Sequence, residues 1–438
     1  MTQKNARFIV AATMLVALGN FALAGDSPPP RNIIGADAVA GIDGRPIDRE
    51  SEAHTNCWGG CHPSRIYVDD DLTECPDADY VSIQDAVDAS DPGDVVIICP
   101  GTYNEQVKIL HDLTLRGRNA VTLLPSPVLA NSTTIGGGDV AAVIAVEGAN
   151  VKIDNLIVDG GRNQQPGCTP FYAGVYYRNA SGEVSNAVIR NMRLGQGLEG
   201  CQSGVGLFVQ SDADVTSRVR LKGSNIHDYQ KGGVVANEPG TILTATGNVV
   251  TGDGPTPSNG QNGVQIGFGA TGRLINNVVT NHVYAPCVSW WDCPAAAVGI
   301  LVSDADSTEV RNNTVTRSQV GIWAVGNRNR IKWNNISDNL VYDGIAIEGN
   351  GNTVSGNRIA SSDESGVYIG GDHNRVIGNR INEAPWGIWI DYGEGTTGLP
   401  FNQFFNTEEN VVFSYDADGG ESADKSTAAR PIPTAVRP

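Results

Sequence analysis

The chain has 438 residues, of which 53 are glycine and 6% are aromatic, and its formal net charge at pH 7 is -18. Many glycines and few aromatic residues favour tight turns and small core side chains over an ordinary α/β enzyme. The acidic balance, with no cluster of Lys and Arg, argues against nucleic acid as a partner, and an acidic polymer would be repelled unless bound cations bridged it.

Residues 1–24 have the pattern of a secretory signal peptide. Lys4 and Arg7 precede the apolar run 8–18, and Ala22-Leu23-Ala24 offers a small-residue cleavage site. No later apolar run reaches the roughly 18 residues that span a bilayer. We therefore expect a secreted or periplasmic monomer that does not insert into a membrane.

Residues 25–64 show no apolar period and are predicted to form a flexible linker. The linker contains CWGGCH, from Cys57 to His62, which resembles the haem c attachment motif with one extra residue between the cysteines. Haem c would need thioether bonds to Cys57 and Cys61, with His62 as axial ligand. Because the motif occurs once and no helical domain surrounds it, a local disulfide or pairing with other cysteines is the favoured alternative.

Residues 65–117 are predicted to begin the fold. RIYVDDD indicates a strand, and SIQDAVDAS indicates a short amphipathic helix that begins with the capping-box spacing of Ser82 and Asp85. A turn and two further strands follow in DPGDVVIICPGTYNEQVKI. Asp69, Asp70 and Asp71 form the densest acidic run, and their carboxylates are candidate ligands of a hard cation such as Ca²⁺, with simple solvation as the alternative.

Between residues 141 and 282 the glycines at 174, 204, 233 and 263 mark long repeats of about 30 residues. The insertions near 160–171, 252–261 and 282–296 are expected to be loops on one face, where they would build a binding site. Trp290 and Trp291, in the last insertion, cannot both point into one core. We predict that they contact substrate, with loop packing as the alternative.

Residues 320–391 contain short repeats, in which Gly321, Gly344, Gly366 and Gly387 follow one another at intervals of 23, 22 and 21 residues. Each unit has two runs of alternating apolar residues, which is typical of strands and not of an amphipathic helix. Short strands with a period of about 22 residues and Gly/Asn turns predict the rungs of an all-β, right-handed, single-stranded parallel β-helix over residues 65–414. The polar residues 415–438 are predicted to be disordered.

The stretch SIQDAVDASDPGDVVIICPGTYNEQVKI, followed by LTLRG, resembles the opening of secreted right-handed β-helix proteins of the pectate-lyase-like superfamily. The resemblance covers roughly residues 65–395 and implies that the short helix covers the first rung, as a terminal repeat requires. PGTYNE is similar to a piece of pectin methylesterases, and Arg330-Ile331-Lys332 matches the R-I-K of polygalacturonases. The Q-D-T, N-T-D and G-H-G catalytic segments of these enzymes and the D-P-H-E of alginate epimerases are missing, so the resemblance implies a fold without a catalytic assignment.

Eight cysteines are an even number compatible with disulfides in an exported chain, although eight allow 105 connectivities. Their spacing suggests three pairs: Cys75 with Cys99, Cys168 with Cys201, and Cys287 with Cys293.

Strand alternation predicts that the first and third residues after each repeat glycine point inward, and the second and fourth point outward. Trp323, Tyr368 and Trp389 occupy the second position on neighbouring rungs, where outward rings would form a stacking platform for sugars. A covering loop or C-terminal segment is the alternative.

Carboxylates follow the same columns. Glu348 and Asp391 occupy the fourth position two rungs apart, roughly 10 Å at the backbone, close to the separation in inverting glycosidases. Asp343 and Glu364, at the starts of adjacent strands, would join them. These four are the predicted catalytic residues, with solvated surface charges as the alternative. In contrast, we interpret the column of Asn277, Asn313, Asn334, Asn357 and Asn379 as a structural ladder of amide hydrogen bonds.

The favoured function is an exported protein that binds, and could cleave, a polysaccharide along the stacked face. A non-catalytic surface or matrix scaffold is the alternative from a different class. A third possibility is copper handling, like that of periplasmic β-helix proteins in nitrous oxide reductase maturation, which share this repeat. The six histidines, at 54, 62, 111, 227, 282 and 373, fall into no close ligand spacing, which counts against it.

Overall fold

The computed structural model describes residues 63–161, 163–287, 293–414 and 435–438. They belong to the second of two compact units, residues 62–438. The predicted signal peptide, most of the linker, the haem motif of Cys57, Cys61 and His62, and the pair Trp290 and Trp291 all lie outside the described residues.

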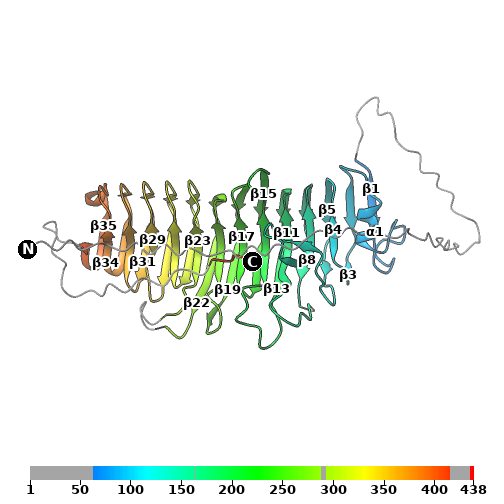
Figure 1. Ribbon diagram of the computed structural model, residues 1–438, viewed down its shortest axis with the longest axis horizontal. Coiled ribbons are helices and arrows are strands. Elements are labelled where there is room, and N and C mark those ends of the chain that lie inside the picture. Colours follow the sequence, from blue (N-terminus) through cyan, green and yellow to red (C-terminus); the bar gives the residue numbers. More distant parts are fainter. Residues whose placement is uncertain (1–62, 162, 288–292, 415–434) are drawn as a thin grey trace, which may run out of the picture. The chain divides into compact units, whose positions relative to one another are not determined.

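Short strands follow one another as rungs, and strands pair in parallel with the equivalent strand of the next rung (Figure 1). The exception is β7 (Ser132–Thr133), which pairs antiparallel with β8 (Asp139–Glu147). One face is a sheet of 12 strands. Its strands are β1 (Arg65–Val68), β2 (Val95–Ile98), β5 (Leu113–Gly117), β9 (Asn150–Asp154), β12 (Ser181–Ser185), β15 (Ser217–Lys222), β18 (Thr241–Thr246), β21 (Thr271–Ile275), β24 (Glu309–Arg311), β27 (Arg330–Lys332), β30 (Thr353–Ser355) and β33 (Arg375–Ile377).

A sheet of 23 strands forms the other two faces. The second face contains β3 (Gly101–Tyr103), β6 (Val121–Leu123), β10 (Ile157–Asp159), β13 (Val188–Met192), β16 (Asn225–Tyr229), β19 (Val249–Thr256), β22 (Val278–Tyr284), β25 (Thr314–Ser318), β28 (Asn335–Asn339), β31 (Arg358–Ser362), and the first halves of β34 (Arg380–Tyr392) and β35 (Gln403–Phe413). The third face contains β4 (Val107–Ile109), β7 (Ser132–Thr133), β8 (Asp139–Glu147), β11 (Phe171–Arg178), β14 (Val205–Gln210), β17 (Gly232–Asn237), β20 (Asn262–Gly267), β23 (Val298–Ser303), β26 (Val320–Val325), β29 (Ile345–Glu348), β32 (Ser365–Gly370) and the second halves of β34 and β35.

The core is the column of apolar side chains enclosed by the three faces. Ile345 and Ile347, the first and third residues after Gly344, are fully buried in it, together with Ile369 of the next rung. Alternation along each strand therefore places side chains as predicted, and the fold is the predicted parallel β-helix. Among the described residues, no helix has the length and apolar character needed to cross a bilayer.

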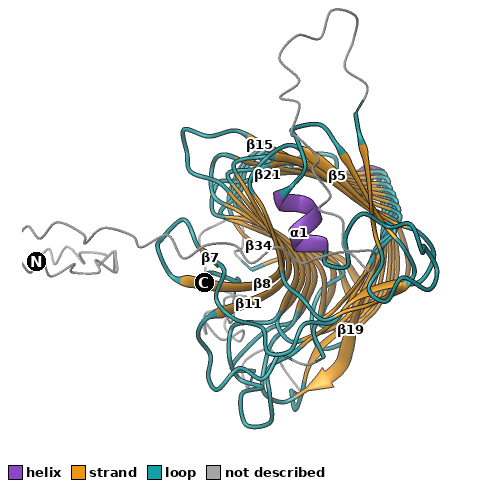
Figure 2. Cartoon of the chain, turned by 90° about the vertical axis from the view of Figure 1, so that its right-hand side faces the viewer, coloured by secondary structure: helices purple, strands orange, loops and turns teal. Residues whose placement is uncertain are grey.

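Helix α1 (Ile83–Asp88) covers the first rung (Figure 2). Its Ile83, Ala86 and Val87 are buried against the core, and the Ser82 side chain caps its N-terminus. The Glu105 carboxylate accepts hydrogen bonds from the Ile83 and Gln84 N–H groups, at 2.7 and 2.9 Å, so it satisfies helix donors that otherwise have no partner. The short 3₁₀ helix η2 (Leu399–Phe401) lies between the last two rungs in the chain.

An asparagine ladder runs inside one turn of the coil. The Asn334 Nδ2 donates to Oδ1 of Asn357 at 3.0 Å and to the Val310 carbonyl at 3.0 Å, while the Asn313 N–H donates to Asn334 Oδ1 at 2.9 Å. The same pattern repeats over Asn248, Asn277, Asn313, Asn334, Asn357, Asn379 and Asn402. The structural interpretation of this column is confirmed, and the ladder extends one residue beyond the prediction at each end.

Between the second and third faces the strands bend at residues in the left-handed conformation, including Asn191, Asp228 and Asn281 with φ of 57°, 55° and 66°. Asn and Asp tolerate this conformation better than other residues with a side chain. The next residue then turns inward. In this way Tyr229 and His282 enter the core, where the Tyr229 hydroxyl hydrogen-bonds His282 Nε2.

Three disulfides join the pairs suggested by spacing: Cys75 with Cys99, Cys168 with Cys201, and Cys287 with Cys293. Such bonds persist in oxidising compartments, which agrees with the predicted location outside the cytoplasm.

The predicted disorder of residues 415–438 is wrong for the last four residues, which pack on the outer side of the third face. Val436 is fully buried, and its N–H and carbonyl bond the Gln265 side chain at 2.8 and 3.0 Å. Val436 fills an apolar gap beside Val205 and Val235, a tertiary contact that the polar composition of the tail does not indicate.

Replacement of one ladder asparagine should destabilise the coil. Asn334→Ala leaves the Asn313 N–H buried without its partner, at a cost of about 1–3 kcal/mol, and also removes the amide that donates to the Val310 carbonyl. Asn335→Ala, at the exposed neighbouring position, is the matched control and should change stability by less than about 0.5 kcal/mol. Urea unfolding monitored by circular dichroism compares the two variants, and equal midpoints would show that the ladder contributes no net stability.

His282 should make the protein sensitive to acid. Burial lowers its pKa to about 3 from 6.5, so between these pH values the unfolded chain binds a proton that the folded chain does not. Stability should therefore fall by about 1.5 kcal/mol from pH 6.5 to pH 5 because of this group alone.

The melting temperature of His282→Gln should accordingly change less over this range than that of the unmutated protein. His373→Gln, at an exposed histidine, should retain the original slope. Parallel pH profiles for all three proteins would contradict the assignment.

Candidate functional site

The predicted aromatic platform points out of the central core but is not exposed. Trp323, Tyr368 and Trp389 are 3%, 3% and 6% exposed, and they belong to a second apolar cluster on the outer side of the third face. Tyr342 is buried in the same cluster, and Trp386 packs edge-on against Trp389 with ring centroids 4.9 Å apart. The expectation of exposed rings is therefore wrong, because other apolar side chains enclose the column.

The predicted catalytic carboxylates lie around this cluster. Glu348 accepts a hydrogen bond from Trp323 Nε1 at 3.0 Å, and Asp391 accepts one from the Tyr368 hydroxyl at 2.9 Å. Asp343, which is fully buried, accepts from Ser365 Oγ at 2.6 Å, and Glu364 is 8% exposed. These contacts satisfy polar atoms of a covered layer, so the catalytic role of the four carboxylates stays a prediction without an open substrate surface to support it.

Truncation of an aromatic side chain in this cluster should lower the free energy of unfolding. Trp389→Ala removes a buried indole and should cost about 3–5 kcal/mol. Trp333→Ala is the matched control, because Trp333 is 58% exposed, and should stay within about 0.5 kcal/mol of the original. Thermal melting measures both, and a Trp389→Ala protein as stable as the control would show that the ring is not part of a packed layer.

The structure instead contains a cavity of about 730 Å³ on the outer side of the second face. It lies over β16, β19 and the segment after β13, and it is lined by Arg193, Asn225, His227, Asp228, Val249, Thr251, Gly252, Asp253, Pro255 and Thr256. Alternation in β16 buries Ile226 in the core and thus directs His227 outward.

Asp253 reaches the cavity because β19 contains an irregularity. Thr251 pairs with Thr280 and Gly254 pairs with His282, so two residues of β19 lie opposite Asn281 alone. A bulge of this kind redirects side chains and is frequent beside functional sites. Gly254 follows with φ of 83°, a conformation that favours glycine.

Opposite charges meet in the cavity. The Arg193 guanidinium forms ion pairs with Asp228, at 3.5 Å, and with Asp253. The His227 Nδ1 lies 2.6 Å from Asp228 Oδ2, and since an ionised carboxylate only accepts hydrogen bonds, Nδ1 is the nitrogen that donates, which in a neutral imidazole leaves the lone pair on Nε2. The site thus combines a charged donor, two acceptors and a histidine held in one tautomer.

A further ion pair joins neighbouring strands of the second face, where Asp159 of β10 pairs with Arg190 of β13 at 2.7 Å. Burial by itself would raise the pKa of Asp159, but hydrogen bonds from Asn191, the Gly161 N–H and Arg190 hold that pKa below its ordinary value. Asp159 therefore stays ionised at neutral pH, although it is not one of the residues that line the cavity.

Buried polar residues hold the loops that enclose the cavity. Gln261 Nε2 donates to Asp253 at 2.9 Å and to the Tyr229 carbonyl at 2.7 Å, and Gln261 Oε1 accepts from the Asp253 N–H at 2.9 Å. Lys231 Nζ donates to the Gly260 carbonyl at 2.6 Å, and burial lowers the pKa of Lys231 to about 7. These contacts fix the position of Asp253 relative to β16.

Sequence reasoning located only part of this site. The insertion 252–261 was expected to help build a binding site, and it supplies Asp253 and Thr256. Arg193, His227 and Asp228 were not identified. The sequence signal that could have identified this site is the outward position of His227 in the strand NIHDY, together with the neighbouring insertion 252–261.

Comparison with solved structures finds parallel β-helix proteins of low sequence identity. The Dettilon tailspike protein matches with a TM-score of 0.51 and 13% identity over 76% of this chain, and the match spans 64% of the tailspike. PfbA, a surface adhesin of Streptococcus pneumoniae, matches with a TM-score of 0.50 and 14% identity, covering 79% of this chain and 92% of PfbA. The GH136 lacto-N-biosidase from Eubacterium ramulus matches with a TM-score of 0.51 and 12% identity, covering 80% and 68%. At such identities the likeness establishes the fold alone.

The comparison with curated proteins finds no match to this sequence. A family model described as periplasmic copper-binding protein (NosD) matches residues 126–421, more than half of the chain and the whole of the cavity. The periplasmic family and the disulfides agree in placing the protein outside the cytoplasm. By this match the chain belongs to the NosD family.

Proposed function

We propose that this protein binds a neutral glycan in the cavity formed by Arg193, His227, Asp228 and Asp253. The observation that carries the proposal is the convergence of charged donors and acceptors in one open cavity on adjacent rungs. Sugar hydroxyl groups both donate and accept hydrogen bonds, so they can use all of these groups at once. The net charge of -18 disfavours a polyanion.

A row of hydroxyl side chains extends from the cavity along the second face. Thr251, Thr280, Thr316 and Ser337 occupy the same register position on four successive rungs. Neighbouring strands lie roughly 4.8 Å apart, so the row offers hydroxyl groups at regular intervals to an extended chain. This arrangement favours a polymer over a single sugar as the ligand.

The His227 and Asp228 pair also suggests the chemistry that a bound glycan could undergo. Asp228 holds the imidazole in the tautomer whose Nε2 can accept a proton, which is the arrangement of a general base. Asp253 is a second carboxylate in the same cavity. Cleavage of the glycan by hydrolysis or elimination is therefore the reaction class proposed for this site.

Copper binding is the second candidate, and the family match is the observation that favours it. Copper sites use imidazole, thiolate or thioether ligands. Among the described residues, one group of three or more His, Cys, Asp or Glu side chains is close enough to share a metal ion: Asp69, Asp71 and Glu74. All three supply oxygen ligands. The six described cysteines form disulfides, and the Arg193 guanidinium beside His227 would repel a cation. The donors in this part of the chain therefore do not fit copper.

Glycan binding should depend on the cavity. His227→Gln and Arg193→Gln should each weaken binding at least about tenfold, because the first removes the imidazole acceptor and the second removes the charged donor, while the melting temperature changes little. His373→Gln, an exposed histidine outside the cavity lining, is the matched control and should bind like the unmutated protein. Affinity electrophoresis over a panel of neutral polysaccharides measures binding, and release of reducing ends or unsaturated products reports cleavage.

Two results would contradict the proposal. If no polysaccharide binds and none is cleaved, a non-catalytic scaffold remains. If stoichiometric copper binding is found by titration and is lost in His227→Gln but not in His373→Gln, the cavity is a copper site instead.

A further inference from the structure

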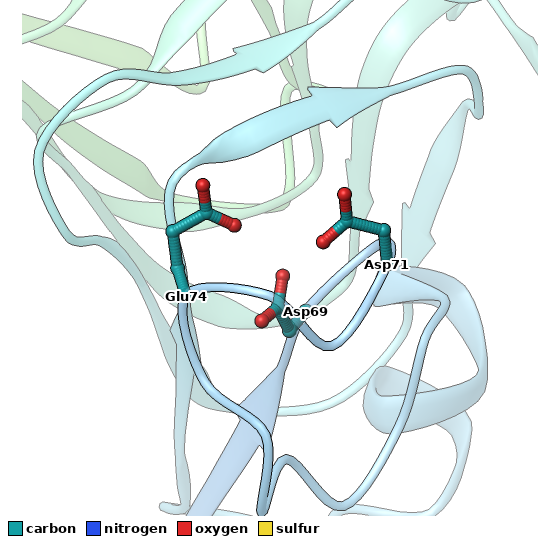
Figure 3. A group of neighbouring side chains, drawn as sticks. All are labelled: Asp69, Asp71 and Glu74. Carbon is teal, nitrogen blue, oxygen red and sulfur yellow. The ribbon is translucent and has the colours of Figure 1, made fainter.

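Three carboxylates meet in the loop that connects β1 to helix α1, far in sequence from the cavity residues. Asp69 directly follows β1, and its side chain faces those of Asp71 and Glu74 (Figure 3). One carboxylate oxygen of each residue lies within 4.8 Å of the corresponding oxygens of the other two. Carboxylates at this separation repel one another unless a cation lies between them.

Asp69 supplies a second and independent observation. The residue is fully buried, and its Oδ2 accepts a hydrogen bond from the Cys75 N–H at 2.5 Å. Its Oδ1 is also buried but has no hydrogen-bond partner among the described residues. A buried carboxylate oxygen without a donor is costly, and coordination of a cation is one of the few ways to satisfy it.

The ligand set differs from the run Asp69, Asp70 and Asp71 that the sequence suggested. The Asp70 carboxylate turns toward β3, where it accepts from the Thr102 N–H at 3.1 Å. It lies so close to Gly101 that a Cβ there would be 2.1 Å from Asp70 Oδ1. Glu74 takes the third place instead, because the chain reverses over residues 71–74, where the Thr73 N–H donates to Asp71 Oδ1 at 2.9 Å.

We propose that Asp69, Asp71 and Glu74 bind a calcium ion. Ca²⁺ takes oxygen ligands at about 2.3–2.6 Å, so two oxygens on one ion can lie up to roughly 5 Å apart, as these do. Asp71 and Glu74 are exposed, which leaves room for water molecules to complete the irregular shell that Ca²⁺ accepts more readily than Mg²⁺ does.

No basic side chain competes for these carboxylates in the described part of the chain, since none of the three forms an ion pair there. Arg118 lies next to the disulfide instead, with Nη1 3.3 Å from the Cys75 sulfur. The site is independent of the proposed function, because it lies outside both the cavity and residues 126–421 matched by the family model.

The ion would hold the loop that enters the capped end of the coil. Glu74 precedes Cys75, which is linked to Cys99 directly after β2, so the ion and the disulfide would restrain the same loop from two sides. Because Ca²⁺ would bind the folded chain and not the unfolded one, it should raise the melting temperature.

Isothermal titration of the full-length, oxidised protein with CaCl₂, after removal of metal with EDTA, tests the proposal. We expect one Ca²⁺ per chain with a dissociation constant of about 1 mM or tighter. Asp71→Asn and Glu74→Gln should weaken binding at least about tenfold and should abolish the rise in melting temperature. Both residues are exposed, so neither variant should prevent folding.

Asp77→Asn is the matched control, because it removes one exposed carboxylate from the same loop without touching the cluster. It should bind Ca²⁺ like the unmutated protein, and MgCl₂ at equal ionic strength should give a smaller shift in melting temperature. The proposal is overturned if the unmutated protein binds no Ca²⁺, if Asp71→Asn and Glu74→Gln bind unchanged, or if Asp77→Asn loses as much affinity as Glu74→Gln. None of these outcomes depends on glycan binding.

Discussion

Register between successive rungs is the constraint on which the rest of this structure depends. A short strand of three to six residues forms few hydrogen bonds of its own, and it is stable only when the strands before and after it are aligned with it. The asparagine ladder enforces that alignment. Each amide bonds the next amide and a backbone carbonyl of the preceding rung, so a slip of one residue would break several buried hydrogen bonds together.

Register also determines what faces solvent. Side chains alternate along each strand, and therefore a column fixed on one rung stays on the same side in the next. On the third face the outward side chains of Trp323, Tyr368 and Trp389 form a second apolar layer, which Tyr342 and Trp386 help to enclose. On the second face, the outward column that contains His227, Thr251, Thr280 and Thr316 is polar. The cavity arises there, at the point where the bulge in β19 interrupts the regular pairing and redirects Asp253.

The two proposed sites illustrate different uses of the same coil. The cavity uses the regular stacking, because His227 and Thr251 are aligned by strand pairing while loops supply the remaining groups. The acidic site uses the end of the coil, where one loop folds back on itself beside a disulfide. Family membership and the similar structures establish the architecture, whereas each site depends on side chains of this chain.

The sequence by itself determined the architecture. The intervals between Gly321, Gly344, Gly366 and Gly387, the alternation around them and the asparagine column all express local rules of strand and turn formation, and they are readable without tertiary information. The cap helix was readable for the same reason, and the three cysteine pairs that the spacing suggested are present in the structure. What covers an outward side chain is a different question, since it depends on residues distant in sequence. Trp389 was therefore expected to be exposed and is buried, and Val436 was expected to be disordered and is packed against Val235.

The same limit applies to the sites. Only the folded chain shows that Arg193 reaches Asp253 and that Glu74 replaces Asp70 beside Asp69, because a bulge and a reversing loop place those side chains and neither has a periodic signal.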